Sequence, residues 1–237
     1  MKIRSLFRWQ VVVLLMLLAI AVSVLPVVAN TRAEGISAQA IPHDSINRSF
    51  RQHYKFLQTS VTPPTFSQCV KITGFPCYSP QLIRKAYGIT PLLNMGFTGK
   101  GQSIVIIDSF GSPTIRHDLK VFDQSYGLPD PPSFKILTPL GTIQFNPNDP
   151  TMIGWAAETT LDVEWSHAIA PDANIVLMTS PVAETEGVQG LPEFLFLEKY
   201  AISHNLGKIV SQSWGATENT LFNPGGGQIF KQWKLLI

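Results

Sequence analysis

The stretch Ser103-Ile-Val-Ile-Ile-Asp108 decides the fold. It is a short β-branched run without polar alternation, which is typical of a strand buried on both faces of a parallel sheet. Gly99 and Gly101 precede it, and Gly111 and Pro113 follow it, so turns bound it on both sides. We therefore expect an α/β fold built around this strand.

Predicted helices and strands alternate after this first strand. Helical spacing of apolar residues extends over 114–126, 152–169 and 192–205. We expect Gly207 to stop the last helix, and Pro147 and Pro150 to mark a loop before the second one. Short apolar runs predict further strands at 134–138, 174–178 and 208–214. This alternation predicts a parallel sheet with helical crossovers.

The N-terminus has the order of a secretory signal. A basic start precedes the apolar run 11–28, and small residues follow at 27–29. The alternative is a transmembrane anchor, but the run is at the short limit for spanning a bilayer, and Pro26 near its end favours a signal. We expect residues 1–29 to be a cleaved signal peptide, so that the mature chain is secreted and keeps no stable membrane anchor.

Residues 30–64 are polar and show little periodicity, which predicts an irregular N-terminal extension. The globular domain is then expected over 65–237. Cys69 and Cys77 are the only cysteines. Two isolated, close cysteines in an exported chain usually pair, so we expect a local disulfide; two free thiols are the alternative.

Composition excludes several classes of protein. The 237 residues carry 18 Lys+Arg and 16 Asp+Glu, a net charge of +2. This balance lacks the basic bias of nucleic-acid binding, so we expect no nucleic-acid partner. A charged fraction of 14% with 45% hydrophobic residues excludes a disordered chain.

The predicted helix 152–169 carries two acids, Glu158 and Asp162, at i and i+4, so both lie on one face. Two adjacent carboxylates resist double ionisation and form a proton-shuttling pair suited to acid conditions. Leu161 and Trp165 are expected towards the other side, where they can pack. The alternative is a pair of solvated surface acids.

Asp108 ends the first strand, and Ser213, Trp214 and Gly215 end the last. Because functional crevices of open α/β sheets lie at the carboxyl ends of the strands, these residues and the acidic helix are expected to share one site. The alternative for Asp108 is a turn or helix cap before Gly111.

Four pieces of sequence together resemble the catalytic domain of the sedolisin family (peptidase S53, serine-carboxyl peptidases). The first is GKGQSIVIID at 99–108 with Asp118-Leu119, Phe122 and YGLP at 126–129. The others are ETTLDVEWSHAIAP at 158–171, VSQSWG at 210–215 followed by Glu218, and Cys69 and Cys77 with YSP at 78–80 and AYG at 86–88. They occur in the family's order over about residues 69–220.

The resemblance implies a subtilisin-like parallel sheet flanked by helices and a serine-type endopeptidase that cleaves polypeptides at acidic pH. The family's general base matches Glu158, and the acid that orients it matches Asp162. The counterparts of Asp108 and Trp214 extend the hydrogen-bond network in some members. Ser213 and Gly215 match a strand that lines the substrate groove, and we assign Ser213 no nucleophilic role.

Acyl transfer also needs a nucleophile and an oxyanion stabiliser. In the family these come from a Gly-Thr-Ser segment and a Ser-Gly-Asp segment after the Ser-Trp-Gly strand, and neither segment is in this sequence. The family's calcium site also lies in that later part, so no cofactor is expected here. We therefore expect a C-terminally truncated, inactive domain.

Other functions have weaker support. A non-catalytic secreted module that binds peptides around Trp214 is the main alternative, and a nucleotide-binding domain lacks its glycine fingerprint. No HExxH, P-loop or EF-hand pattern occurs. No histidine has a Ser-His-Asp context, and His167 is expected to be a partly buried packing residue near Asp162.

Overall fold

The structure is a computed structural model that describes residues 62–184, 189–215, 228 and 231–232. All of them belong to the compact unit 50–237. The predicted signal at 1–29 and all but the last three residues of the extension at 30–64 lie outside the described residues.

Four parallel strands form the sheet, in the order β2-β3-β1-β4. They are β1 (Ser103–Ser109), β2 (Phe134–Leu137), β3 (Asn174–Ser180) and β4 (Ile209–Ser211). In register, Ile106 of β1 lies between Leu177 of β3 and Ser211 of β4. The predicted parallel α/β sheet is confirmed. The apolar run that predicted β1 reflects its place between two neighbouring strands, covered on both faces.

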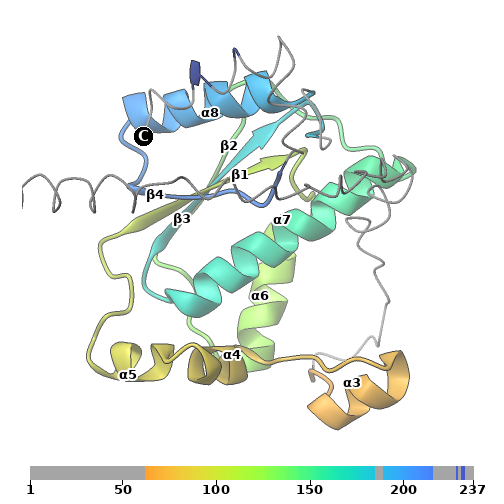
Figure 1. Cartoon of the computed structure of the whole chain (residues 1–237), viewed down its shortest axis with the longest axis vertical. Helices are drawn as coiled ribbons and strands as arrows, with labels where there is room; N and C mark the ends of the chain where they lie inside the picture. Colours follow the sequence, from red (N-terminus) through yellow and green to blue (C-terminus); the bar gives the residue numbers. More distant parts are fainter. Residues whose placement is uncertain (1–61, 185–188, 216–227, 229–230, 233–237) are drawn as a thin grey trace, which may run out of the picture. The chain divides into compact units, whose positions relative to one another are not determined.

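Successive residues of β1 point to opposite faces and enter two separate cores. Ile104 and Ile106 pack in one cluster with residues of α6 (Ile115–Tyr126) and α7 (Pro150–Ile169). Val105 and Ile107 pack in the other with residues of α8 (Leu191–Ser203). Figure 1 shows α8 on one side of the sheet and α6 with α7 on the other.

Helix α7 begins earlier than expected. Asp149 is its N-cap, and its Oδ1 accepts hydrogen bonds from the backbone N–H groups of Thr151 and Met152. Pro150, which we expected in the preceding loop, occupies the first turn of the helix. Proline is tolerated there because its missing N–H would have no partner within the helix.

The predicted inward face of α7 is wrong at Leu161. That side chain is 41% exposed, whereas the buried residues of the helix are Thr159, Asp162, Val163, His167 and Ala168. The buried stripe therefore contains polar groups that an apolar periodicity cannot detect. Because Asp162 is one of these buried residues, the alternative that Glu158 and Asp162 are both solvated surface acids is wrong for Asp162.

The segment from α8 to β4 differs from the prediction. The helix ends at Ser203, and Asn205 adopts a left-handed conformation with φ 49°. Gly207 therefore lies beyond the helix end, where a Cβ would come 2.6 Å from the Ser103 carbonyl oxygen. A glycine is needed at this position because the backbone of residue 207 passes too close to β1 for a side chain. Strand β4 has three residues rather than the predicted seven.

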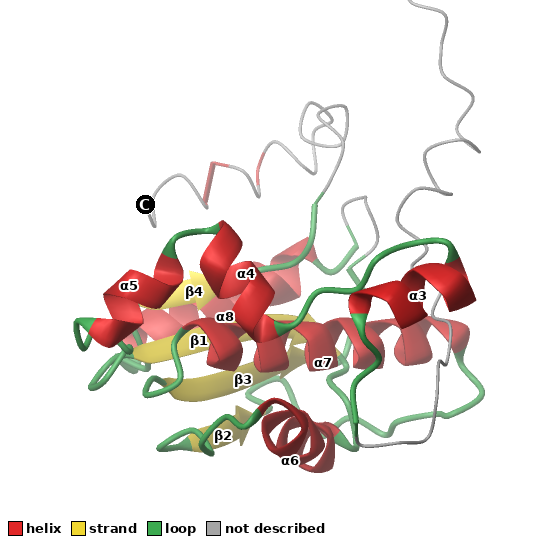
Figure 2. Cartoon of the chain, turned by 90° about the horizontal axis from the view of Figure 1, so that it is seen from below, coloured by secondary structure: helices red, strands yellow, loops and turns green. Residues whose placement is uncertain are grey.

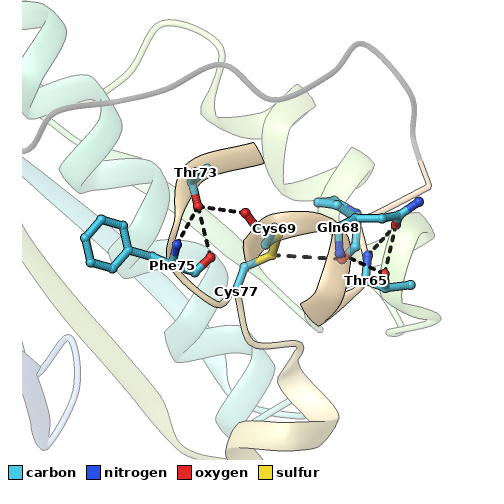
Figure 3. Close-up of a disulfide and its surroundings, with 7 residues drawn as sticks. Thr65, Gln68, Cys69, Thr73, Phe75 and Cys77 are labelled. Atoms are coloured by element: carbon cyan, nitrogen blue, oxygen red, sulfur yellow. Dashed lines mark hydrogen bonds between the residues drawn. A yellow bond between two sulfur atoms is a disulfide. The ribbon is translucent and has the colours of Figure 1, made fainter. Parts of the chain in front are cut away.

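Three short helices precede the sheet and have no counterpart in the predicted elements: α3 (Phe66–Thr73), α4 (Pro80–Ala86) and α5 (Ile89–Asn94). Cys69 of α3 forms a disulfide with Cys77, which follows the helix, and the capping box of Thr65 and Gln68 lies next to it (Figure 3). Arg84 of α4 donates a hydrogen bond from Nε to the Ala168 carbonyl at 2.6 Å. This bond joins α4 to the C-terminal end of α7.

Candidate functional site

Asp108 lies at the carboxyl end of β1 and is fully buried. The backbone continues through Ser109 into Phe110, which has φ 59°, and Gly111, which has φ 73°. A non-glycine residue in the left-handed region is uncommon and is enriched at functional sites. The strand therefore ends in a constrained turn directly after its buried acid.

Helix α7 brings two more acids to this edge. Asp162 is 9% exposed, and Glu158 lies one turn earlier and is partly buried. Both interact electrostatically with the Asp108 carboxyl group. The structure therefore brings together the three acids that the sequence suggested, from β1 and from α7.

Ser213, just after β4, joins the same group. Its Oγ donates a hydrogen bond to Asp162 Oδ1 at 2.8 Å, although the residue itself is exposed. The hydroxyl thus connects the buried carboxyl cluster with the molecular surface. Gly215 is exposed two residues further on.

Trp214 points into the apolar core beside the site. Its ring meets Phe194 of α8 with centroids 5.6 Å apart and an interplanar angle of 67°. Trp155, near the start of α7, meets the same Phe194 ring at 6.2 Å. Phe194 therefore packs between the N-terminal part of α7 and the segment after β4. This packing helps to position Ser213, in the same segment, next to Asp162.

Burial controls the protonation of these carboxyl groups. It raises the pKa of Asp108 well above its ordinary value, and the neighbouring charges of Asp162 and Glu158 raise it further, while the Thr159 hydroxyl lowers it. Burial also raises the pKa of Asp162, while the hydrogen bond from Ser213 and the nearby Asp108 carboxyl group lower it. The complete burial of Asp108 therefore favours its protonated form, and the Ser213 hydroxyl favours the ionised form of Asp162.

Several buried polar atoms in this cluster have no hydrogen bond of normal geometry to a described residue: Asp108 Oδ1, Asp108 Oδ2, Asp162 Oδ2 and Thr159 Oγ1. Buried polar groups are nearly always satisfied, so a concentration of exceptions calls for an explanation. Thr159 was missed from the sequence. Its position three residues before Asp162, which places it on the same side of the helix, is the sequence feature that would have indicated it.

A second titratable cluster lies between α6 and α7, where sequence reasoning expected only packing. His167 and Asp123 are 0% and 2% exposed, and His167 Nε2 is 3.3 Å from Asp123 Oδ1. The same Nε2 is 2.7 Å from the Pro129 carbonyl oxygen. His167 is therefore fully buried against Asp123, rather than partly buried near Asp162 as we expected.

Metal binding has no support within the described ranges, where no group of three or more His, Cys, Asp or Glu side chains is arranged to hold an ion. None of the helices formed by the described residues is long and apolar enough to cross a membrane.

Comparison with known proteins gives no family assignment. No protein-family model matches the chain, and no curated protein matches it significantly.

Proposed function

We propose that Glu158, Asp162 and Asp108 form the carboxylate relay of a secreted, acid-acting serine-carboxyl endopeptidase of the sedolisin kind. The observation that carries this proposal is the meeting of Asp162 with Asp108 and with the exposed Ser213 hydroxyl at the carboxyl edge of the sheet. The substrate class is polypeptide. The four sequence pieces that resemble the sedolisin family support the same function, and in a subtilisin-like domain this edge faces the substrate.

Each carboxyl group has a distinct role in this mechanism. Glu158 is the general base that takes the proton from a nucleophilic serine hydroxyl and returns it to the leaving amine. Asp162, one turn away on the same face of α7, orients Glu158. Asp108 is the buried proton holder that keeps the cluster from accumulating three negative charges.

The electrostatics favour operation in acid. The pKa values of Asp108 and Asp162 are both raised, chiefly by burial. A general base and the groups that support it work best when their pKa values lie near the working pH. Protons can move among these carboxyl groups in mild acid, whereas at higher pH the cluster would hold repelling charges.

The Gly-Thr-Ser and Ser-Gly-Asp segments that supply the nucleophile and the oxyanion stabiliser in the sedolisin family do not occur in these 237 residues. Ser112, in the Gly-Ser-Pro loop, hydrogen-bonds Thr114 at 3.2 Å before α6 and is used locally. Ser213 is hydrogen-bonded to Asp162 rather than to the general base. We therefore infer that these 237 residues have no peptidase turnover alone.

The test compares residues 30–237 with the same chain extended by the downstream genomic sequence, in the reading frame that encodes Gly-Thr-Ser and Ser-Gly-Asp segments. Both forms are assayed on a denatured protein at about pH 4, where a carboxylate pair shuttles protons. We expect cleavage only by the extended form. The absence of such a frame, or cleavage by the short chain, would contradict the proposal. Peptide binding without cleavage by both forms would favour the binding module.

A further inference from the structure

Outside the candidate site, α7 takes part in a cluster of buried titratable groups that the proposed mechanism does not use. Asp123 on α6 and His167 on α7 are almost completely buried against each other. Glu164, three residues before His167, is partly buried and interacts with Asp118 and Asp123 of α6. We call this contact between the two helices the α6–α7 seam; Figure 2 shows α6 end-on beside α7.

Hydrogen bonding in the seam favours neutral side chains. His167 Nε2 donates its hydrogen to the Pro129 carbonyl oxygen. The same nitrogen lies 3.3 Å from Asp123 Oδ1 but has no second hydrogen to donate, so this contact is not a hydrogen bond. Both Asp123 carboxyl oxygens and His167 Nδ1 lack a hydrogen-bond partner among the described residues. If Asp123 were ionised, its buried charge would have no hydrogen-bond donor. If His167 were protonated, the added Nδ1–H would be buried without an acceptor. Each of these charged forms costs folding free energy.

No arginine or lysine of the described residues forms an ion pair with Asp123 or Glu164. The charged and titratable groups that face the seam come from every neighbouring element. They are Asp118 and Tyr126 of α6, Asp130 after α6, Arg84 of α4 and Asp172 after α7. Arg84 is directed at the Ala168 carbonyl. The carboxyl groups of the seam therefore repel one another when ionised, and His167, whose pKa is lowered chiefly by burial, is neutral at the pH where they ionise and does not compensate their charge.

We propose that the α6–α7 seam is a pH-sensitive contact that is closed while Asp123 and Glu164 are protonated and loosens when they ionise. Because α7 also carries Glu158 and Asp162, loosening the seam displaces the candidate site. The seam is thus a built-in device that disables the site outside acidic conditions.

The direction of the effect follows from the pKa values. Burial and the charge of Asp130 raise the pKa of Asp123 to about 7, and burial with Asp118 and Asp123 raises the pKa of Glu164 to about 8. Both groups stabilise the folded state fully below their unfolded pKa values near 4, and this stabilisation is lost as the pH rises through about 7–8.

The contribution of His167 to stability changes with pH in the opposite direction. Burial is the largest cause that lowers its pKa, and Arg84 adds to it, while the Pro129 hydrogen bond and Asp130 and Asp172 work against it. Its contribution is present above its unfolded pKa of about 6.5 and is lost as the pH falls. The two carboxyl groups outnumber it, so we expect the seam to be tightest in mild acid.

The test is hydrogen–deuterium exchange of residues 30–237 at about pH 5 and about pH 8, expressed as protection factors so that intrinsic exchange cancels. We expect protection of α6 and α7 to fall by at least about tenfold at the higher pH, since one pKa unit corresponds to tenfold in an equilibrium. Helix α8, on the other face of the sheet, should change much less.

Variants decide whether the seam causes the change. Asp123→Asn with Glu164→Gln should abolish the difference between the two pH values, while Glu193→Gln on α8 should keep it. If the double variant does not fold, Glu164→Gln alone should reduce the difference. Equal protection of wild-type α6 and α7 at both pH values, or an undiminished fall in the seam variants, would overturn the proposal.

Discussion

Helix α7 contributes side chains to two clusters of carboxyl groups, and the clusters differ in their surroundings. The site cluster, Asp108 with Asp162 and Glu158, receives a hydrogen bond from the exposed Ser213. The seam cluster, Asp123 and Glu164 with His167, is enclosed between α6 and α7. Burial raises carboxyl pKa values in both. A raised pKa alone therefore does not locate a functional site; a hydroxyl that reaches the surface at the strand ends distinguishes the first cluster.

The largest expected difference between the clusters is in catalysis. In the extended form of the chain, Glu158→Gln should lower kcat by about 10²- to 10⁴-fold, the usual contribution of a general base. Glu164→Gln, on the same helix, should leave kcat at about pH 4 unchanged, because that carboxyl is already protonated there. Similar losses in both variants would remove the functional distinction between the clusters.

The second expected effect is on stability as a function of pH. The free energy of unfolding of residues 30–237, measured by urea titration, should fall between about pH 4 and about pH 8 as Asp123 ionises. Asp123→Asn should reduce this fall by on the order of 3 kcal/mol, because a pKa shift of one unit is about 1.4 kcal/mol. Glu193→Gln should reproduce the wild-type fall. An unchanged fall in Asp123→Asn would show that the seam does not control it.

A pair of truncations tests which face of α7 is buried. Val163 is 0% exposed in the core beside α6, and Val163→Ala should cost about 2 kcal/mol of unfolding free energy. Leu161→Ala should cost less than about 0.5 kcal/mol, because that side chain is largely in solvent. Thermal or urea unfolding measures both. The reverse order would mean that α7 is rotated and that the two clusters are placed incorrectly.

The smallest expected effect concerns the hydroxyl that distinguishes the site cluster. Ser213→Ala removes the hydrogen bond to Asp162 and should cost about 1 kcal/mol. The Asp162 pKa should rise, since this bond lowers it, so the loss should be larger at neutral pH than in acid, where the carboxyl is protonated. Ser203→Ala, at the exposed end of α8, serves as the control. A loss independent of pH would show that Ser213 does not interact with an ionisable group.

Local patterns predicted much of the fold. The β-branched runs of β1 and β3 and the spacing of α6 were sufficient because each feature depends on burial that repeats along one element. The short helices α3 to α5 were not predicted, since capping residues rather than long apolar stripes define them. The exposed position of Leu161 was also missed, because buried Thr159 and Asp162 replace apolar residues on the inner face.

The candidate site was only partly predictable. Parallel strands place Asp108 and the segment after β4 at one edge, and i, i+4 spacing joins Glu158 to Asp162. The Ser213–Asp162 bond depends on where the chain leaves a strand of only three residues, which no pattern reveals. The seam escaped prediction because Asp123, Glu164 and His167 come from two helices whose contact is purely tertiary.

Titration of individual side-chain carboxyl groups by NMR in residues 30–237 tests the central claim most directly. We predict coupled, raised pKa values for Asp108 and Asp162, with Asp162 ionising first and rising further in Ser213→Ala. Asp123 and Glu164 should titrate near about 7 and about 8 and should not respond to that substitution. Four independent titrations near the ordinary value of about 4 would contradict both the relay and the seam.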